Sequence, residues 1–228
     1  HGVKHATAVL AHAQNALNNS DLGDDERLAV QLGALLHDAD DRKYFAHDGL
    51  QNAMRILKEL QDECELNPTI SGQVLRMIEL VSCSKNGNSC PVDCEMNPHL
   101  LWPRWADRLE AIGEIGIVRC YQYTKHTKAP LCTKKTPKPT NAAEVYALAT
   151  PERFEAYQSG KAVSASFMDH FYDKLIQITR PPTDIVQNKY FEQEMVARCQ
   201  PLVDLCLTYG RNGKVPVAEI EALVAAYA

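Results

Sequence analysis

The sequence has little of what marks membrane proteins, nucleic-acid-binding proteins or disulfide-rich domains. No apolar run approaches the ~20 residues that a membrane-spanning helix needs, so we expect no membrane contact. Lys and Arg total 24 against 29 Asp and Glu, and the net charge of -5 gives no electrostatic reason to expect a nucleic-acid partner. The eight cysteines are sparse in 228 residues and include no CxxC pair, which argues against a disulfide scaffold or a zinc-thiolate site. No signal peptide opens the sequence, and we expect a cytoplasmic protein.

Hydrophobic residues, 45% of the chain, recur with the 3.6-residue period of helices, whereas the two-residue alternation of strands is scarce. This pattern predicts an all-α protein. The predicted helices cover residues 3–17, 24–36, 48–65 and 69–81, a long stretch that begins at Trp102, and residues 167–178, 195–206 and 217–227. Residues 83–98 contain an Asn-Gly-Asn turn signal and two prolines, which predicts a loop.

The length suits a single domain with a modest insertion. Residues 125–141 hold five lysines and no acidic residue, which predicts a flexible basic loop. We therefore predict one domain over residues 1–228, with an insertion at about 125–160 and C-terminal helices over about 163–228. The basic loop is either a lid drawn to a polyphosphate or a solvated insertion, and the sequence leaves both roles open.

His37 and Asp38 are adjacent at the end of a very apolar helix segment. A neighbouring imidazole nitrogen and carboxylate oxygen can reach one cation, and mixed nitrogen and oxygen sites suit Mn, Fe, Co, Ni or Zn. Asp41 lies four residues after His37, on the same face if the helix continues, where its carboxylate could take a proton from water. The alternative is a plain helix end with solvated acids.

Three histidines lie on one flank of the first predicted helix, at positions 1, 5 and 12. His5 is the candidate ligand, because it lies near the start of the helix and beside the predicted core. His12, two turns further on, is expected to be a surface or packing histidine.

The long predicted helix carries Asp107, Glu110 and Glu114 at a spacing that places them on one face. Such a face is usually solvated. Asp107, however, lies among tryptophans, alanines and other apolar residues, and an acid in those surroundings needs an arginine or a metal as a partner.

Three separated motifs carry a resemblance to a known family. They are LLHDADDRKY over 35–44, ADRLEAIG over 106–113 and HFYDKL over 170–175, and His5 precedes them in the chain. Their order resembles the H…HD…D signature of HD-domain metal-dependent phosphohydrolases, in particular the small standalone HD hydrolases. The similarity covers most of the chain except roughly residues 125–160. One departure is the end of the fourth helix, where VSCSK stands in place of a histidine-containing run and favours a single ion.

The resemblance implies an HD-domain helical bundle that hydrolyses a phosphate ester or anhydride, with a small nucleotide as the expected substrate. It implies one divalent ion (Mn, Mg, Co, Ni, Fe or Zn) held by His5, His37, Asp38 and Asp107, with Asp41 handling the proton of the attacking water. The expected substrate contacts are Lys43, Arg108, His170 and Lys174, although Arg108 could instead pair with Glu110 or Glu114.

Other functions stay open at this stage. The chain could be a non-catalytic HD module that binds a nucleotide, or a diiron HD oxygenase, which would need extra histidines. The expected partner is a small phosphorylated molecule, and the sequence leaves a homodimer open.

Overall fold

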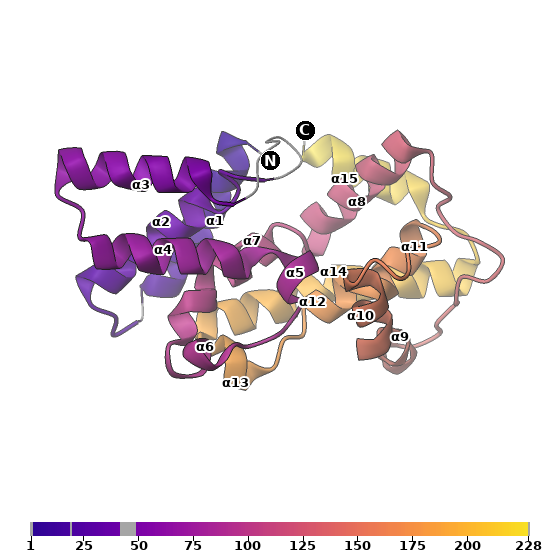
Figure 1. Ribbon diagram of the computed structural model, residues 1–228. Helices are drawn as coiled ribbons and strands as arrows, with labels where there is room; N and C mark the ends of the chain where they lie inside the picture. The colour runs from indigo at the N-terminus through magenta and orange to yellow at the C-terminus, as the bar shows by residue number, and fades with distance from the viewer. Residues whose placement is uncertain (1, 19, 42–48, 228) are drawn as a thin grey trace. The chain divides into compact units, whose positions relative to one another are not determined.

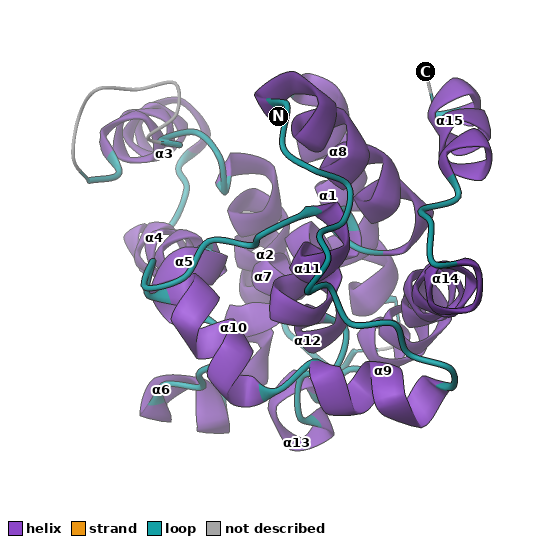
Figure 2. Cartoon of the chain, turned by 90° about the vertical axis from the view of Figure 1, so that its right-hand side faces the viewer, coloured by secondary structure: helices purple, strands orange, loops and turns teal. Residues whose placement is uncertain are grey.

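The computed structural model describes residues 2–18, 20–41 and 49–227, and these residues form helices and loops without a strand (Figures 1 and 2). The all-α prediction is confirmed. The chain divides into two compact units. Unit 1 contains His1–Ser82, Ser89–Asp107 and Thr183–Glu192, and unit 2 contains Cys83–Asn88, Arg108–Pro182 and Gln193–Ala228. In the described part of the chain, no helix is long and apolar enough to cross a membrane.

Unit 1 is built on four long helices and several short ones. The long helices are α1 (Val3–Leu17), α2 (Asp24–Leu36), α3 (Gln51–Cys64) and α4 (Pro68–Val81). The short ones are α6 (Val92–Met96), the 3-10 helix η1 (Pro98–Leu101), most of α7 (Trp102–Leu109) and α13 (Thr183–Val186). The four long helices agree closely with the predicted ranges. The predicted loop over 83–98 is wrong in part, because α6 lies in it together with α5 (Cys83–Asn86) of unit 2.

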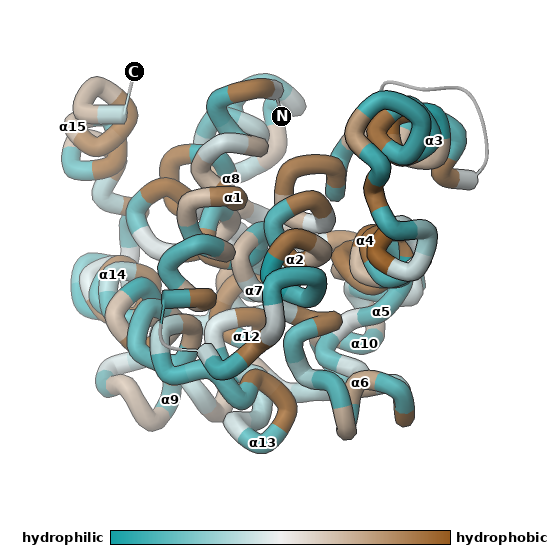
Figure 3. Tube along the Cα trace, turned by 90° about the vertical axis from the view of Figure 1, so that its left-hand side faces the viewer, coloured by the Kyte–Doolittle hydropathy of each residue, from teal (hydrophilic) through white to brown (hydrophobic). Residues whose placement is uncertain are grey.

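Helix α2 packs against both α1 and α4. Leu28 and Leu35 are 39% and 41% exposed, and the buried residues of this helix are Ala29, Val30, Gly33, Ala34 and Leu36. Gly33 lets α4 approach closely, since a Cβ added there would lie 3.1 Å from the Cβ of Met77. Helix α3 is more hydrophilic than α1, α2 and α4 and buries only Ala53 and Leu57 (Figure 3).

Unit 2 contains the remaining helices. They are α5, α8 (Gly113–Thr127), α9 (Ala142–Leu148), α10 (Pro151–Gln158), α11 (Phe167–His170), the π-helical segment η2 (Phe171–Leu175), α12 (Ile176–Ile178), α15 (Val217–Ala226) and, from Gln193 on, α14 (Lys189–Asn212). Its core includes edge-to-face contacts that Phe167 makes with Tyr121 and Phe171, with ring centroids 6.0 and 5.0 Å apart.

The helix predicted to run on from Trp102 is interrupted. Helix α7 ends at Leu109 and α8 begins at Gly113, which has a φ of 68°, a conformation that favours glycine. Glycine is also needed there for space, because an added Cβ would lie 3.1 Å from the Cβ of Arg198. Asp107 and Glu114 therefore belong to different helices, and the predicted acidic face does not form.

The basic segment before α9 is anchored within unit 2. The backbone amides of Phe167 and Met168 donate to the carbonyl oxygens of Pro130 and Leu131 at 3.0 and 3.1 Å. Thr136 is buried, and its hydroxyl donates to Asp169 at 2.8 Å. The middle of the segment predicted as a flexible loop is therefore held by hydrogen bonds within unit 2, and its role stays open.

Candidate metal centre

Three helices of unit 1 bring together the four residues predicted to bind a metal. His5 lies in the first turn of α1, His37 caps the C-terminal end of α2 with Asp38 next in the chain, and Asp107 lies near the end of α7. The chain turns immediately after α2, where the amide of Ala39 donates to the carbonyl oxygen of Leu36 at 2.9 Å. The histidine and the aspartate are therefore presented at a helix end.

The side-chain donor atoms of these residues are close to one another. His5 Nε2 lies 3.2 Å from His37 Nε2 and 3.3 Å from Asp107 Oδ1. His37 Nε2 lies 3.4 Å from Asp38 Oδ2 and 3.6 Å from Asp107 Oδ1, and His5 Nε2 lies 3.7 Å from Asp38 Oδ2. His5, His37 and Asp38 form the one group of three or more potential metal-ligating side chains found among the described residues.

A hydrogen bond to the backbone fixes the tautomer of the neutral His37 ring. Its Nδ1 lies 2.7 Å from the carbonyl oxygen of Ala34. A carbonyl oxygen only accepts hydrogen bonds, so Nδ1 carries the hydrogen and the Nε2 of the neutral ring presents a lone pair to the cluster. Histidine ligands in metalloproteins are commonly held this way by a second bond from the other ring nitrogen.

The cluster favours positive charge. Burial acts to lower the pKa of His37, but the bond to Asp38 and the charge of Asp107 outweigh it, and the pKa is raised. Burial acts to raise the pKa of Asp107, but the bond from His5 and the charge of His37 hold it below its ordinary value. Two ionised carboxylates thus face two imidazoles, and a cation is attracted to the space between them.

This donor set fits a divalent ion. Ligand atoms ~2.1 Å from one ion, at tetrahedral or octahedral angles, lie ~3.0–3.4 Å apart. Five pairs of donor atoms in the cluster lie 3.2–3.7 Å apart, within or slightly above that range, and the donors of His5, His37 and Asp38 all lie within 4.8 Å of one another. The side chains of His5 and His37 are 9% and 1% exposed, against 30% and 28% for Asp38 and Asp107, so the cluster reaches solvent on its carboxylate side. A ligand could enter from there.

Asp41 does not lie on a helical face shared with His37. The predicted shared face required α2 to continue beyond His37, but the helix ends at Leu36 and residues 37–40 form turns. The amide of Asp41 donates to the carbonyl oxygen of Asp38 at 3.2 Å, which keeps its backbone beside the cluster. Its catalytic role stays a prediction.

Asp40 has a role that the sequence argument missed. This buried carboxylate accepts the backbone N–H groups of Asn52 and Ala53, at 2.8 and 2.9 Å, and so caps the first turn of α3. The side-chain amide of Asn52 also donates to the carbonyl oxygen of Ala39 at 3.0 Å. These bonds tie the turn that carries Asp38 to a neighbouring helix. The only sequence signal was another acidic residue two positions after Asp38.

His12 was expected to be a surface or a packing histidine, and the structure shows a packing histidine. Its Nδ1 lies 2.6 Å from the hydroxyl of Tyr190, and the amide of Asn15 donates to the same hydroxyl at 3.4 Å. His1 and Lys43 lie outside the described residues, so the predicted substrate contact of Lys43 stays a prediction.

The other predicted substrate residues belong to unit 2. Arg108 is buried and donates to the side chain of Asn88 at 2.6 Å and to the carbonyl oxygen of Gly87. These partners differ from the glutamates proposed for it. His170 lies 3.2 Å from the hydroxyl of Ser164, and burial together with Lys174 lowers its pKa to about 3.

Lys174 also has a defined neighbour in unit 2. Its ammonium lies 5.6 Å from the ring centroid of Tyr157, which in turn meets the ring of His170 edge to face. At neutral pH, His170 offers hydrogen bonds and Lys174 offers charge. The predicted substrate contacts of Arg108, His170 and Lys174 stay predictions.

Similarity to a viral protein places the chain in a family, although no protein-family model matches it. An uncharacterized protein of Acanthamoeba polyphaga mimivirus is 36% identical over 218 residues, which cover 92% of this chain and 88% of the viral protein.

Solved structures share the fold at low sequence identity. An HD-superfamily hydrolase from Bacillus thuringiensis superposes with a TM-score of 0.59 at 19% identity, over 92% of this chain and 86% of that one. Proteins from Lactobacillus plantarum and Listeria innocua give TM-scores of 0.60 and 0.58, each at 18% identity. They cover 93% and 90% of this chain, and 87% and 84% of their own. The chain thus belongs to the same family as the mimivirus protein and has the HD-domain fold.

Proposed function

We propose that this protein is a divalent-metal-dependent hydrolase of phosphate esters or anhydrides, and that its substrate is a small nucleotide. The observation that carries the proposal is the cluster of His5, His37, Asp38 and Asp107, whose reported donor-atom spacings are 3.2–3.7 Å. The HD-domain fold supports it, since one of the structures that share the fold is described as an HD-superfamily hydrolase.

The four residues would hold one ion, and their two carboxylates would balance its charge. A divalent ion at such a site lowers the pKa of coordinated water toward ~7 and neutralises charge on phosphoryl oxygens. His37 contributes a fixed lone pair, because Ala34 occupies its other nitrogen. Within the described residues, His5, His37 and Asp38 form the one group of three potential ligands whose donor atoms all lie within 4.8 Å of one another.

In this proposal, Asp41 accepts the proton of the attacking water. Water attacks phosphorus, the bond from phosphorus to the leaving oxygen breaks, and a proton returns to the leaving group. Lys43, Lys174 and Arg108 are the proposed cationic contacts to the phosphate. His170 would take part as a neutral hydrogen-bonding group, because its pKa is lowered to about 3.

The test is hydrolysis by the full chain after metal removal and reconstitution. Chelator-treated protein is supplied with Mn, Mg, Co, Ni, Fe or Zn, one at a time, and incubated with nucleoside mono-, di- and triphosphates and sugar phosphates. Product masses distinguish phosphate release from pyrophosphate release. We expect activity only with metal. Since metal catalysis supplies several kcal/mol, Asp38→Asn and Asp107→Asn should each lower kcat/KM on the order of 100-fold or more.

The matched control is His12→Gln, which changes a histidine of α1 that bonds Tyr190 rather than the cluster. It should keep both metal and activity. Full activity without metal, or in Asp38→Asn, would overturn the proposal. Tight nucleotide binding without turnover on the whole panel would instead assign a non-catalytic nucleotide-binding module, and two irons per chain would indicate the oxygenase.

A further inference from the structure

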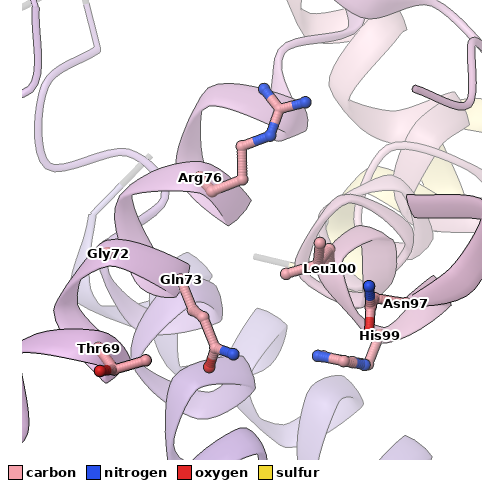
Figure 4. A pocket seen from close by; sticks show the side chains of 7 residues that line it. All are labelled: Thr69, Gly72, Gln73, Arg76, Asn97, His99 and Leu100. Carbon is pink, nitrogen blue, oxygen red and sulfur yellow. The ribbon is translucent and has the colours of Figure 1, made fainter. Parts of the chain in front are cut away.

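Unit 1 has a second feature of interest, a cavity of about 470 Å³ between α4 and η1. One wall is a face of α4 formed by Thr69, Gly72, Gln73 and Arg76, and the other consists of Asn97, His99 and Leu100 (Figure 4). Its volume falls within the ~300–1,000 Å³ of ordinary small-molecule sites. Glu26, in the first turn of α2, lies 4.0 Å from His99, which places this wall of the cavity near the N-terminal end of α2. The 11 residues from Glu26 to His37 span ~16 Å of helix, so this cavity is distinct from the metal centre.

The cavity contains polar groups that lack partners. His99 is 5% exposed, and its buried Nε2 has no hydrogen-bond partner; Glu26 is too far away to accept. Among the described residues, the Gln73 amide also makes no side-chain hydrogen bond. Figure 4 shows the Gln73 amide and the His99 imidazole pointing toward one another across the cavity. Buried polar groups are normally satisfied, so a ligand that bonds to the buried Nε2 of His99 and to the half-exposed amide of Gln73 would complete this site.

The cavity favours a neutral ligand. Arg76 is its one cationic side chain, and the guanidinium donates two bonds to Asp93, at 2.8 and 3.0 Å. In Figure 4 it points away from Gln73 and His99. Burial also lowers the pKa of His99, so that its ring is uncharged. Phosphate or another anion would therefore find no free charge here.

The remaining surface leaves open space beside α4. Gly72 has no side chain, and a Cβ added there would meet nothing within 4 Å, while Leu100 supplies an apolar contact on the opposite wall. A glutamine amide pairs with the amino group and N7 of adenine through two hydrogen bonds. We propose that this cavity binds an adenine base, free or within a nucleoside, between Gln73 and His99.

Isothermal titration of the full protein with adenosine tests this proposal separately from the proposed function. Adenosine has no phosphate to hydrolyse, and no metal-ligating residue is altered. Inosine is the matched ligand, because it replaces the amino donor of the base with a carbonyl oxygen. We expect adenosine to bind with one site per chain and inosine to bind ~10-fold more weakly, for the loss of about one hydrogen bond. Adenine, titrated alone, shows whether the ribose contributes.

Two variants locate the binding. Gly72→Leu should abolish adenosine binding by filling the cavity, while Gly72→Ala, which adds only a methyl group, should stay within about threefold of wild type. Gln73→Leu keeps the size of the side chain and should weaken adenosine ~10-fold while removing the preference over inosine. Circular dichroism and metal content should match wild type in all three variants. Failure of both adenine and adenosine to bind, equal affinity for inosine, or unchanged binding by Gly72→Leu would overturn the proposal.

Discussion

His37 donates its Nδ1 hydrogen to the carbonyl oxygen of Ala34, one turn earlier in the chain, at 2.7 Å. The bond leaves Nε2 facing Asp38 at 3.4 Å and Asp107 at 3.6 Å. The same helix end thus supplies a ligand and sets its tautomer. An imidazole held in this way needs no reorientation before it binds a metal.

His37→Gln is therefore expected to lower the affinity for Mn at least ~10-fold, because an amide is a poorer ligand than a preoriented imidazole. Equilibrium dialysis of chelator-treated protein against Mn measures the effect. His12→Gln is the control, since His12 bonds Tyr190, and its Mn affinity should equal that of wild type. An equal loss in both variants would mean that the cluster does not hold the ion.

The neighbouring acids Asp40 and Asp41 are expected to separate by function. Asp40→Ala removes the acceptor of two backbone N–H groups in the first turn of α3, and should lower the free energy of unfolding by ~1–2 kcal/mol. Asp41→Asn should change stability by less than ~0.5 kcal/mol and instead lower kcat of the proposed hydrolysis. Urea titration and initial rates measure the two quantities. The opposite pattern would exchange the two roles.

The predictions from sequence succeeded where the signal was local. The ends of α1, α2 and α4, and the all-α class, follow from apolar period and helix-terminal residues. The shared location of His5, His37, Asp38 and Asp107 was predicted from residue type and motif order, and the structure brings them together, although their role as ligands stays a prediction.

The predictions failed where distant parts of the chain decide the structure. Gly113, where the helix breaks, packs closely against Arg198, which lies 85 positions further along the chain. Arg108 was predicted to contact the substrate or to pair with Glu110 or Glu114, whereas the hydrogen bonds described for it reach residues 87 and 88, whose position depends on the folded chain. Likewise, nothing local shows that Asp40 caps α3 from 12 residues away.

His170 is expected to make stability depend on pH. Burial and the charge of Lys174 lower its pKa to about 3, whereas the ordinary value is 6.5. Between these values the unfolded chain binds a proton that the folded chain does not, so stability falls as the pH drops from about 7 toward 3. His170→Gln keeps a hydrogen-bonding group next to Ser164 but does not titrate.

Urea unfolding at pH 5 and pH 8 measures this effect. The difference between the two free energies of unfolding should be smaller in His170→Gln than in wild type. His126→Gln is the control, because that histidine is exposed near the end of α8 and should leave the pH dependence unchanged. Equal pH dependence in wild type and His170→Gln would show that His170 is protonated as readily in the folded chain as in the unfolded one.

Two glycines inside helices of unit 1 are expected to respond in opposite ways to alanine. Both substitutions gain up to ~1 kcal/mol of helix propensity. At Gly72 the new Cβ meets nothing within 4 Å, so Gly72→Ala should stabilise the protein by up to that amount. At Gly33 the Cβ would lie 3.0 Å from the sulfur of Met77 and 3.1 Å from the ring of Pro103.

Met77 is fully buried and its Cβ is fixed by α4, so α2 and α4 must move apart by a few tenths of an ångström when Gly33 gains a methyl group. Overpacking of this kind costs ~1–3 kcal/mol, which exceeds the gain in propensity. Gly33→Ala should therefore lower the midpoint of thermal unfolding while Gly72→Ala raises it. A higher midpoint of thermal unfolding in both Gly33→Ala and Gly72→Ala would mean that α2 and α4 pack less closely than the structure shows. Because α2 carries His37 at its end, loss of metal affinity in Gly33→Ala alone would link this helix contact to the geometry of the cluster.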